Sequence, residues 1–171
     1  AMAAMRGVTC LVTRDDVDPA RIGMTGYSAG AVATLIVGAV DTRVTATVPL
    51  SGTHAWDEAV KSEQAWQHTL LSQAGYDTSS PQWTRLMQHL ITPAATAAHT
   101  HAKVLLVNGT TDEFFPMTAH FATWDAIPGA TKRTALVANM DHGCYALTGI
   151  EGASSIEARA KTHATGGQRA W

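Results

Sequence analysis

The segment that most restricts the fold of this chain is Gly26-Tyr27-Ser28-Ala29-Gly30. Residues 21–26 predict a short buried strand, and residues 30–40 are apolar on nearly every side, which is typical of a buried helix. Glycines two positions to either side of the serine let such a strand and helix approach closely, and the tight turn holds the serine in a strained conformation with its hydroxyl exposed. A strand that leads directly into a buried helix favours a parallel sheet.

Three later segments predict the remaining strands: Val44–Leu50, Lys103–Gly109 and residues 134–137. Before Pro128, the residues Ala119, Phe121, Trp124 and Ile127 predict a short amphipathic helix. This order of elements predicts an α/β domain with a mainly parallel sheet flanked by helices.

A long segment, residues 53–101, separates the strand ending near Leu50 from the strand ending near Val107. We expect it to be a helical insertion: residues 57–72 predict one helix, with Gly75 as its stop. A second helix is predicted with Ser80 as N-cap and Pro81 in its first position. An apolar stripe follows at helical spacing: Trp83, Leu86, Met87, Leu90 and Ile91. We expect the insertion to cap the strand ends and shape an entrance above Ser28; ordinary core packing is the alternative.

The two ends of the chain give weaker signals. Residues 1–7 predict the end of a small-residue helix stopped at Gly7, and residues 8–12 form a short apolar run. Residues 153–171 lose their apolar periodicity, and we expect this tail to fray. Cys10 and Cys144 both lie among apolar residues, which favours buried free thiols.

The amino-acid composition argues against some classes of binding partner. The chain has 171 residues, of which 46% are apolar, so one globular domain over residues 1–171 is expected. Only 15% of the residues are charged and the formal net charge is -2, which provides no basic field for nucleic acid. No apolar stretch reaches the roughly 20 residues that span a bilayer. We expect a soluble protein without nucleic-acid or membrane partners. Its oligomeric state, and whether it is cytoplasmic or secreted, stay open.

Ser28 suggests a hydrolytic site only if the chain also supplies a base and an acid that orients the base, because a serine hydroxyl alone is a poor nucleophile. Asp112 follows the predicted strand at 103–109, and His142 follows the final strand. The carboxyl ends of parallel strands meet at one edge of a sheet, where α/β active sites gather, so we expect the three side chains to lie together. Asp141 is a rival acid, although neighbouring residues on a strand point in opposite directions.

Candidate substrate-binding residues lie beside the same strand ends: Tyr27, His54, Trp56 and Phe115, with Phe114 as a further one. His99 and His101 are two residues apart, but no carboxylate or cysteine accompanies them, so a solvated loop is favoured over a metal site. We expect neither a metal nor a cofactor.

Three segments together resemble the α/β-hydrolase superfamily, in the group of acetyl xylan esterases and prolyl-oligopeptidase-like hydrolases. They are the strand and Gly-Tyr-Ser-Ala-Gly turn at 18–30, the Gly-Thr-x-Asp-x-x-x-Pro loop at 109–116, and Asp-His-Gly at 141–143. The resemblance spans roughly residues 8–145. It implies that Ser28 is the nucleophile, Asp112 the acid and His142 the base, with the amide of Ala29 as one oxyanion donor.

The chain departs from this family before Ser28, where several strands and a second oxyanion donor usually occur. No His-Gly-Gly-type loop is found there. We therefore expect the carboxyl-terminal part of a partial α/β-hydrolase fold that lacks its N-terminal strands.

The resemblance implies a serine hydrolase that cleaves carboxylic esters through an acyl-enzyme, with acetylated carbohydrates as one candidate class of ester. Its partner would be a small ester or a short peptide. The alternatives are a serine peptidase of the prolyl-oligopeptidase-like type and a non-catalytic fragment that retains the hydrolase core.

Overall fold

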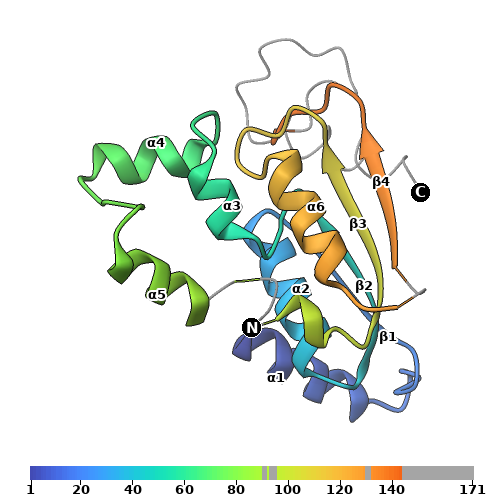
Figure 1. Cartoon of the computed structure of the whole chain (residues 1–171). Coiled ribbons are helices and arrows are strands. Elements are labelled where there is room, and N and C mark those ends of the chain that lie inside the picture. The colour runs from blue at the N-terminus through green and yellow to red at the C-terminus, as the bar shows by residue number, and fades with distance from the viewer. Residues whose placement is uncertain (90–91, 93–95, 130–131, 144–171) are drawn as a thin grey trace.

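The structure, a computed structural model, describes residues 1–89, 92, 96–129 and 132–143. Its sheet has four strands in the order β1-β2-β3-β4, and every neighbouring pair is parallel (Figure 1). The strands are β1 (Ile22–Tyr27), β2 (Val44–Leu50), β3 (Lys103–Gly109) and β4 (Lys132–Val137). The prediction of an α/β fold with a parallel sheet is confirmed. Residues 153–171 and Cys144 lie outside the described residues.

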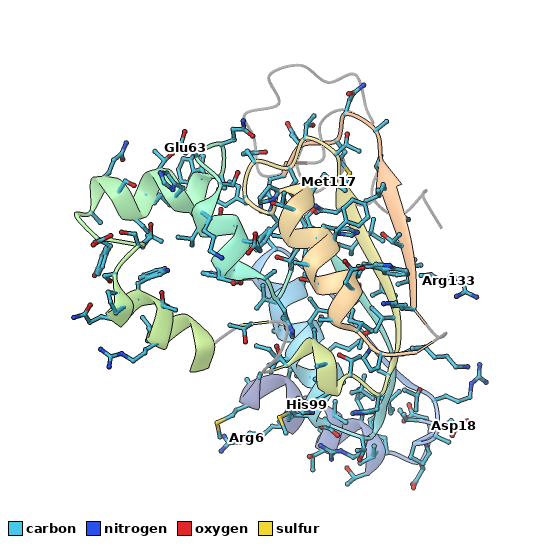
Figure 2. The ribbon with its side chains drawn as sticks, in the orientation of Figure 1. Arg6, Asp18, Glu63, His99, Met117 and Arg133 are labelled. Atoms are coloured by element: carbon cyan, nitrogen blue, oxygen red, sulfur yellow. The ribbon has the colours of Figure 1, made fainter. Side chains whose placement is uncertain are left out.

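The helices in the described part of the chain are α1 (Met2–Val12), α2 (Ala29–Val40), α3 (Trp56–Lys61), α4 (Trp66–Gln73), α5 (Pro81–His89), the short 3-10 helix η1 (Ala97–His99) and α6 (Met117–Ala126). One cluster of the core lies where α2, η1 and α6 meet the sheet, and its members are Leu35, Ala97, Val104, Leu106 and Ile127. By contrast, α4 and α5 stand to one side of the sheet in Figure 1. Charged side chains such as Arg6, Asp18 and Arg133 lie at the outside of the molecule (Figure 2).

The first helix corrects one prediction, because α1 does not stop at Gly7 but continues to Val12. Val8 is 5% exposed and packs in a cluster with Ile22, Val37 and Val44. Burying a valine stabilises a fold by about 1.5–3 kcal/mol. A glycine inside a helix costs about 1 kcal/mol, so packing outweighs the local preference. Cys10, expected to be buried, is exposed on this helix.

The segment between β2 and β3 is helical as predicted, but the single helix predicted for 57–72 is wrong. The structure has two helices, α3 and α4, separated at residues 62–65. The break frees the backbone N–H of Trp66, which donates a 2.7 Å hydrogen bond to the carbonyl of Glu113 in the loop after β3. The first residue of α4 is therefore held by a tertiary contact.

The start of α5 follows the prediction. Pro81 is its first residue, and the N–H of Trp83 donates to the hydroxyl of Ser80 at 3.1 Å. Of the predicted apolar stripe, Leu86 is 49% exposed. Leu90 and Ile91 lie outside the described residues, as does the side chain of Met87.

The turn from β1 into α2 is crowded on one side only. A Cβ placed on Gly26 would overlap the carbonyl group of Gly30 and lie 2.9 Å from the hydroxyl of Thr34. A Cβ placed on Gly30 would meet nothing within 4 Å. The close approach of strand and helix therefore depends on Gly26, and the second glycine of the motif is sterically free.

Two histidines are buried within the fold and have hydroxyl partners. His54 is 0% exposed and its Nδ1 lies 2.6 Å from the hydroxyl of Thr96. His120 is 1% exposed and its Nε2 lies 2.8 Å from the hydroxyl of Thr134. Burial disfavours the charged imidazolium and lowers the pKa of each histidine to about 4.

The asymmetry of the β1–α2 turn predicts different outcomes for its two glycines. We expect Gly26→Ala to lower the free energy of unfolding by about 1–3 kcal/mol, because the new methyl group forces the backbone apart. We expect Gly30→Ala to leave it unchanged or to raise it by up to about 1 kcal/mol, since alanine favours a helix. Urea unfolding of both variants measures the difference, and equal losses in stability would contradict the crowding at Gly26.

The buried histidines predict a loss of stability in acid. The unfolded chain binds a proton on each near pH 6.5, whereas the folded state does so only near pH 4. The two neutral histidines therefore make their whole contribution to the free energy of unfolding above pH 6.5. That contribution falls as the pH drops from 6.5 to 4, by about 2 kcal/mol per histidine at pH 5. Urea unfolding at pH 8 and pH 5 tests this.

His120→Gln should remove about half of that pH dependence. Replacement of the exposed His99 by Gln provides the control and should leave it unchanged. A His120→Gln variant that loses stability as steeply as the parent would contradict the assignment.

Candidate active site

Ser28 lies at the carboxyl end of β1 in a strained backbone conformation, with φ 55° and ψ −120°. A non-glycine residue with positive φ is uncommon and needs support from its surroundings. Here the N–H of Ser28 donates to the carbonyl of Leu50 at 2.9 Å, and its own carbonyl accepts from Ala31 and Val32 at the start of α2. The backbone is thus tied to β2 on one side and to α2 on the other.

Asp112 lies in the loop between β3 and α6, and its side chain is 0% exposed. Its Oδ1 accepts hydrogen bonds from the N–H groups of Phe114 at 2.9 Å and Phe115 at 2.8 Å. The amide of Asn108, at the end of β3, donates to the carbonyl of Phe115 at 2.8 Å. These bonds fix the direction of the carboxylate.

His142 follows β4 and is 9% exposed. Its N–H donates to the carboxylate of Glu113 at 3.0 Å, and its carbonyl accepts a hydrogen bond from the hydroxyl of Tyr27. The ring of Phe114 lies 4.4 Å from the imidazole and the ring of Tyr27 stacks on it at 5.1 Å. Contacts from the end of β1 and from the loop after β3 therefore hold His142 in place.

Ser28, Asp112 and His142 form one hydrogen-bonded chain, as expected from the strand order. The Nδ1 of His142 lies 3.1 Å from both Oδ1 and Oδ2 of Asp112, and its Nε2 lies 2.9 Å from the Oγ of Ser28. A carboxylate can only accept, so this pairing places the imidazole proton on Nδ1. The lone pair on Nε2 then faces the serine hydroxyl and can receive its proton.

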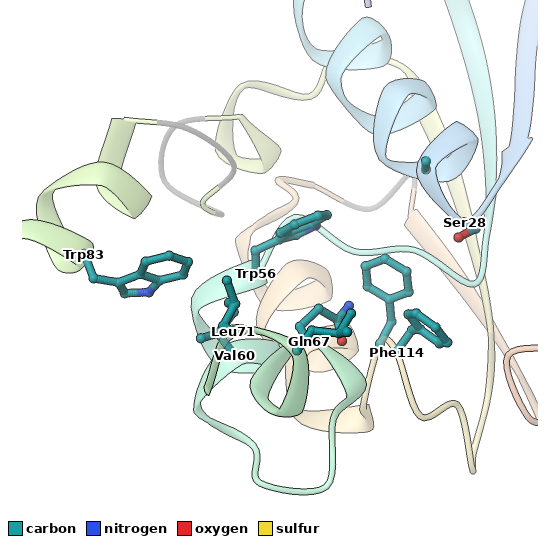
Figure 3. Close-up of a pocket in the computed structure, with 10 residues that line it drawn as sticks. Ser28, Trp56, Val60, Gln67, Leu71, Trp83 and Phe114 are labelled. Carbon is teal, nitrogen blue, oxygen red and sulfur yellow. The ribbon is translucent and has the colours of Figure 1, made fainter. Parts of the chain in front are cut away.

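A cavity of about 370 Å³ opens beside Ser28. Its lining residues are Ser28, Ala29, Trp56, Val60, Gln67, Leu70, Leu71, Trp83, Phe114 and Phe115 (Figure 3). Most of them are apolar and come from the helical segment between β2 and β3. Ala29 is also the first residue of α2, where backbone N–H groups have no partner within the helix.

The structure divides the predicted substrate-binding residues into two groups. Trp56 and Phe115, together with Phe114, line the cavity. Tyr27 instead contacts His142, and His54 is fully buried against Thr96; neither is among the lining residues. For His54 the reason is that β2 leads into a buried turn before α3 begins.

Sequence reasoning missed the contribution of α3 and α4 to the cavity: Val60, Gln67, Leu70 and Leu71. The signal was present, since residues 67, 70 and 71 share one face of a helix by their spacing. It was hidden because α4 carries few apolar residues and its boundaries were misplaced.

Within the described ranges, no group of three or more His, Cys, Asp or Glu side chains could hold a metal ion. In the same part of the chain, none of the helices has the length and apolar character needed to cross a membrane.

Solved structures with a similar fold include esterases and peptidases. One is an acetyl xylan esterase from Paenibacillus sp. R4. The match covers 80% of this chain and 45% of the esterase chain, with a TM-score of 0.69 and 20% identity. A puromycin-hydrolyzing peptidase from Mycobacterium tuberculosis matches 81% of this chain and 21% of its own, with a TM-score of 0.64 and 22% identity. For the acylaminoacyl peptidase of Pyrococcus horikoshii, the match covers 81% of this chain and 22% of the peptidase chain, with a TM-score of 0.65 and 18% identity.

This chain therefore spans less than half the length of each of these proteins. The likeness identifies the described sheet and its helices as part of an α/β-hydrolase fold. Comparison with curated protein sequences found no match. The model of the prolyl oligopeptidase family matches residues 4–160, a range that includes all four strands. Sequence and fold agree, and the chain belongs to the prolyl oligopeptidase family.

Proposed function

We propose that this protein is a serine hydrolase that cleaves carboxylic esters through an acyl-enzyme. The observation that carries the proposal is the hydrogen-bonded chain from Asp112 through His142 to Ser28. It ends at a serine in a strained turn beside a cavity large enough for a substrate group. Family membership supports the same reaction class.

In the proposed mechanism, the Oγ of Ser28 attacks the substrate carbonyl while the Nε2 of His142 takes its proton. Asp112 holds the imidazole in the required tautomer and stabilises the imidazolium that forms. The backbone N–H of Ala29, at the start of α2, donates to the oxyanion of the tetrahedral intermediate. His142 then protonates the leaving group, and water, activated by the same imidazole, releases the acid and regenerates Ser28.

Tyr27 and Phe114 act in this scheme as positioning residues. Tyr27 binds the carbonyl of His142, and Phe114 lies against its ring. Because the imidazole must face Ser28 and Asp112 at once, these contacts reduce its freedom to rotate. Neither residue needs to exchange a proton with substrate.

The cavity favours an apolar substrate group over a sugar. Its walls include four aromatic side chains, from Trp56, Trp83, Phe114 and Phe115. Such walls desolvate an acyl group well but offer few partners for carbohydrate hydroxyls. An ester of an apolar acid is therefore the preferred substrate class. A peptidase acting on short peptides is the second candidate, supported by family membership.

We further propose that α3, α4 and α5 form a cap whose inner face selects the substrate group. They contribute Trp56, Val60, Gln67, Leu70, Leu71 and Trp83 to the cavity wall. The cap is held to the loop that carries Asp112 by the hydrogen bond from Trp66 to Glu113 and by the ring contact of Trp66 with Phe114 at 5.1 Å.

Removal of the Ser28 hydroxyl tests its role as the nucleophile. In the full-length protein, Ser28→Ala should lower kcat for 4-nitrophenyl acetate by about 10⁶-fold, because the attacking atom is lost. A fluorophosphonate probe should label the parent at Ser28 and fail to label the variant. Thermal melts should show that both proteins are folded.

Hydrolysis by the variant at the parental rate would refute the mechanism. A folded parent that neither hydrolyses the ester nor accepts the probe would support the non-catalytic alternative. An aminoacyl 4-nitroanilide assayed beside the ester ranks the two substrate classes, and faster cleavage of the anilide would make the peptidase the main function.

If the cap selects the acyl group, truncation of Trp83 should change the preference for acyl chain length. We expect Trp83→Ala to alter the ranking of 4-nitrophenyl esters from acetate to decanoate while the melting temperature changes little. Leu86→Ala is a matched control on the same helix, because Leu86 is half exposed and does not line the cavity. If Trp83 served only as core, the substitution would instead cost about 3–5 kcal/mol and leave the ranking unaltered.

A further inference from the structure

The amide oxygen of Gln67, a residue that lines the cavity, lacks a hydrogen-bond partner among the described residues. Gln67, on α4, lines the cavity and is 9% exposed. Its Oε1 is buried and has no hydrogen-bond partner among the described residues. A buried amide oxygen without a partner is costly and rare in folded proteins. A leucine or methionine of similar size would line the same wall without that cost, so the amide points to a bound group that completes it.

A second polar atom with the same property belongs to the same cavity. The indole Nε1 of Trp56, on α3, is buried and lacks a partner within the described part of the chain. Indole N–H is a donor only, whereas the glutamine oxygen is an acceptor. Two side chains that line the cavity thus carry one donor and one acceptor, both buried among apolar groups and without a partner among the described residues. Figure 3 shows Trp56 and Gln67 directed toward the space between the cap helices and Ser28.

A hydroxyl group has the chemistry that each of these atoms lacks, because it can donate to an amide oxygen or accept from an indole N–H. The rest of the wall matches a flat ring, since four aromatic side chains surround the space. Aromatic rings pack favourably against one another in offset or edge-on arrangements. The combined chemistry is that of an aryl group that carries a hydroxyl.

We infer that Gln67 is a specificity-determining residue that accepts a hydrogen bond from the hydroxyl of a hydroxyaryl acyl group, so that the protein prefers phenolic acyl groups to their phenyl analogues. This inference rests on the proposed hydrolase function and names its substrate class. A site that hydrogen bonds a substrate hydroxyl disfavours the analogue without it, because its own polar groups are then left unpaired in the complex.

Two esters that differ in a single oxygen test this inference: the ethyl esters of N-acetyl-L-tyrosine and N-acetyl-L-phenylalanine. Their carbonyl groups have the same intrinsic reactivity, so the ratio of their kcat/KM values reports the pocket. We expect the full-length protein to prefer the tyrosine ester by at least about tenfold, within the range known for such sites. Gln67→Met should bring the ratio to about one.

Leu70→Met is the matched control, because Leu70 lines the cavity from the same helix but carries no polar atom. It should keep the parental ratio. Gln67→Leu provides a second removal of the amide. Both Gln67 variants should melt at or above the parental temperature, since the buried amide oxygen that they lose has no partner among the described residues. A lower melting temperature with an unchanged ratio would assign Gln67 a structural role and overturn the inference.

Equal rates on the two esters in the parent would also overturn it. So would hydrolysis of 4-nitrophenyl acetate without hydrolysis of either aryl ester, because the cavity would then not receive the acyl group. Failure on all three esters, with no probe labelling at Ser28, would instead refute the proposed function and the substrate preference with it.

Discussion

The site depends on how far a loop can reach across the edge of a parallel sheet. Neighbouring strands lie about 4.8 Å apart, so the ends of β1 and β4 are separated by about 14 Å. The Nε2 of His142 nevertheless lies 2.9 Å from the Oγ of Ser28. The loop after β4 achieves this by crossing the end of β3 at Gly109, where any side chain would overlap the carbonyl of Met140. The N–H of Thr111 donates to that same carbonyl at 3.2 Å and fastens the crossing.

Burial alone does not distinguish the histidine at the site from the others. His54, His120 and His142 are all at most 9% exposed. What differs is the partner of each ring: hydroxyls of Thr96 and Thr134 for the first two, and the carboxylate of Asp112 for the third. A hydroxyl can pair with one nitrogen of a neutral imidazole, whereas a buried carboxylate would also stabilise an imidazolium. The partner of the ring, rather than its burial, therefore separates His142 from the other two histidines.

Short sequence patterns predicted the elements whose conformation depends mainly on neighbouring residues in the chain. The strands, the turn at Ser28 and the loops that carry Asp112 and His142 all have short sequence signals, and parallel pairing brings their ends together. Prediction failed where a distant contact decides the outcome. Gly7 would end α1 in isolation, but Val8 packs against Ile22 and keeps the helix intact. The break before Trp66 depends on Glu113, and the position of His54 on its partner Thr96.

The link between Trp66 and the loop after β3 makes the helical segment at 53–101 a poor candidate for modular exchange. The N–H of Trp66 donates to the carbonyl of Glu113, and the ring of Trp66 contacts Phe114. Phe114 in turn lies against the imidazole of His142. A chimera that receives the helices of a relative in order to acquire its selectivity would also lose this brace. Residues 113 and 114 would have to be transplanted with the helices, so the cavity wall and the alignment of the imidazole would change together.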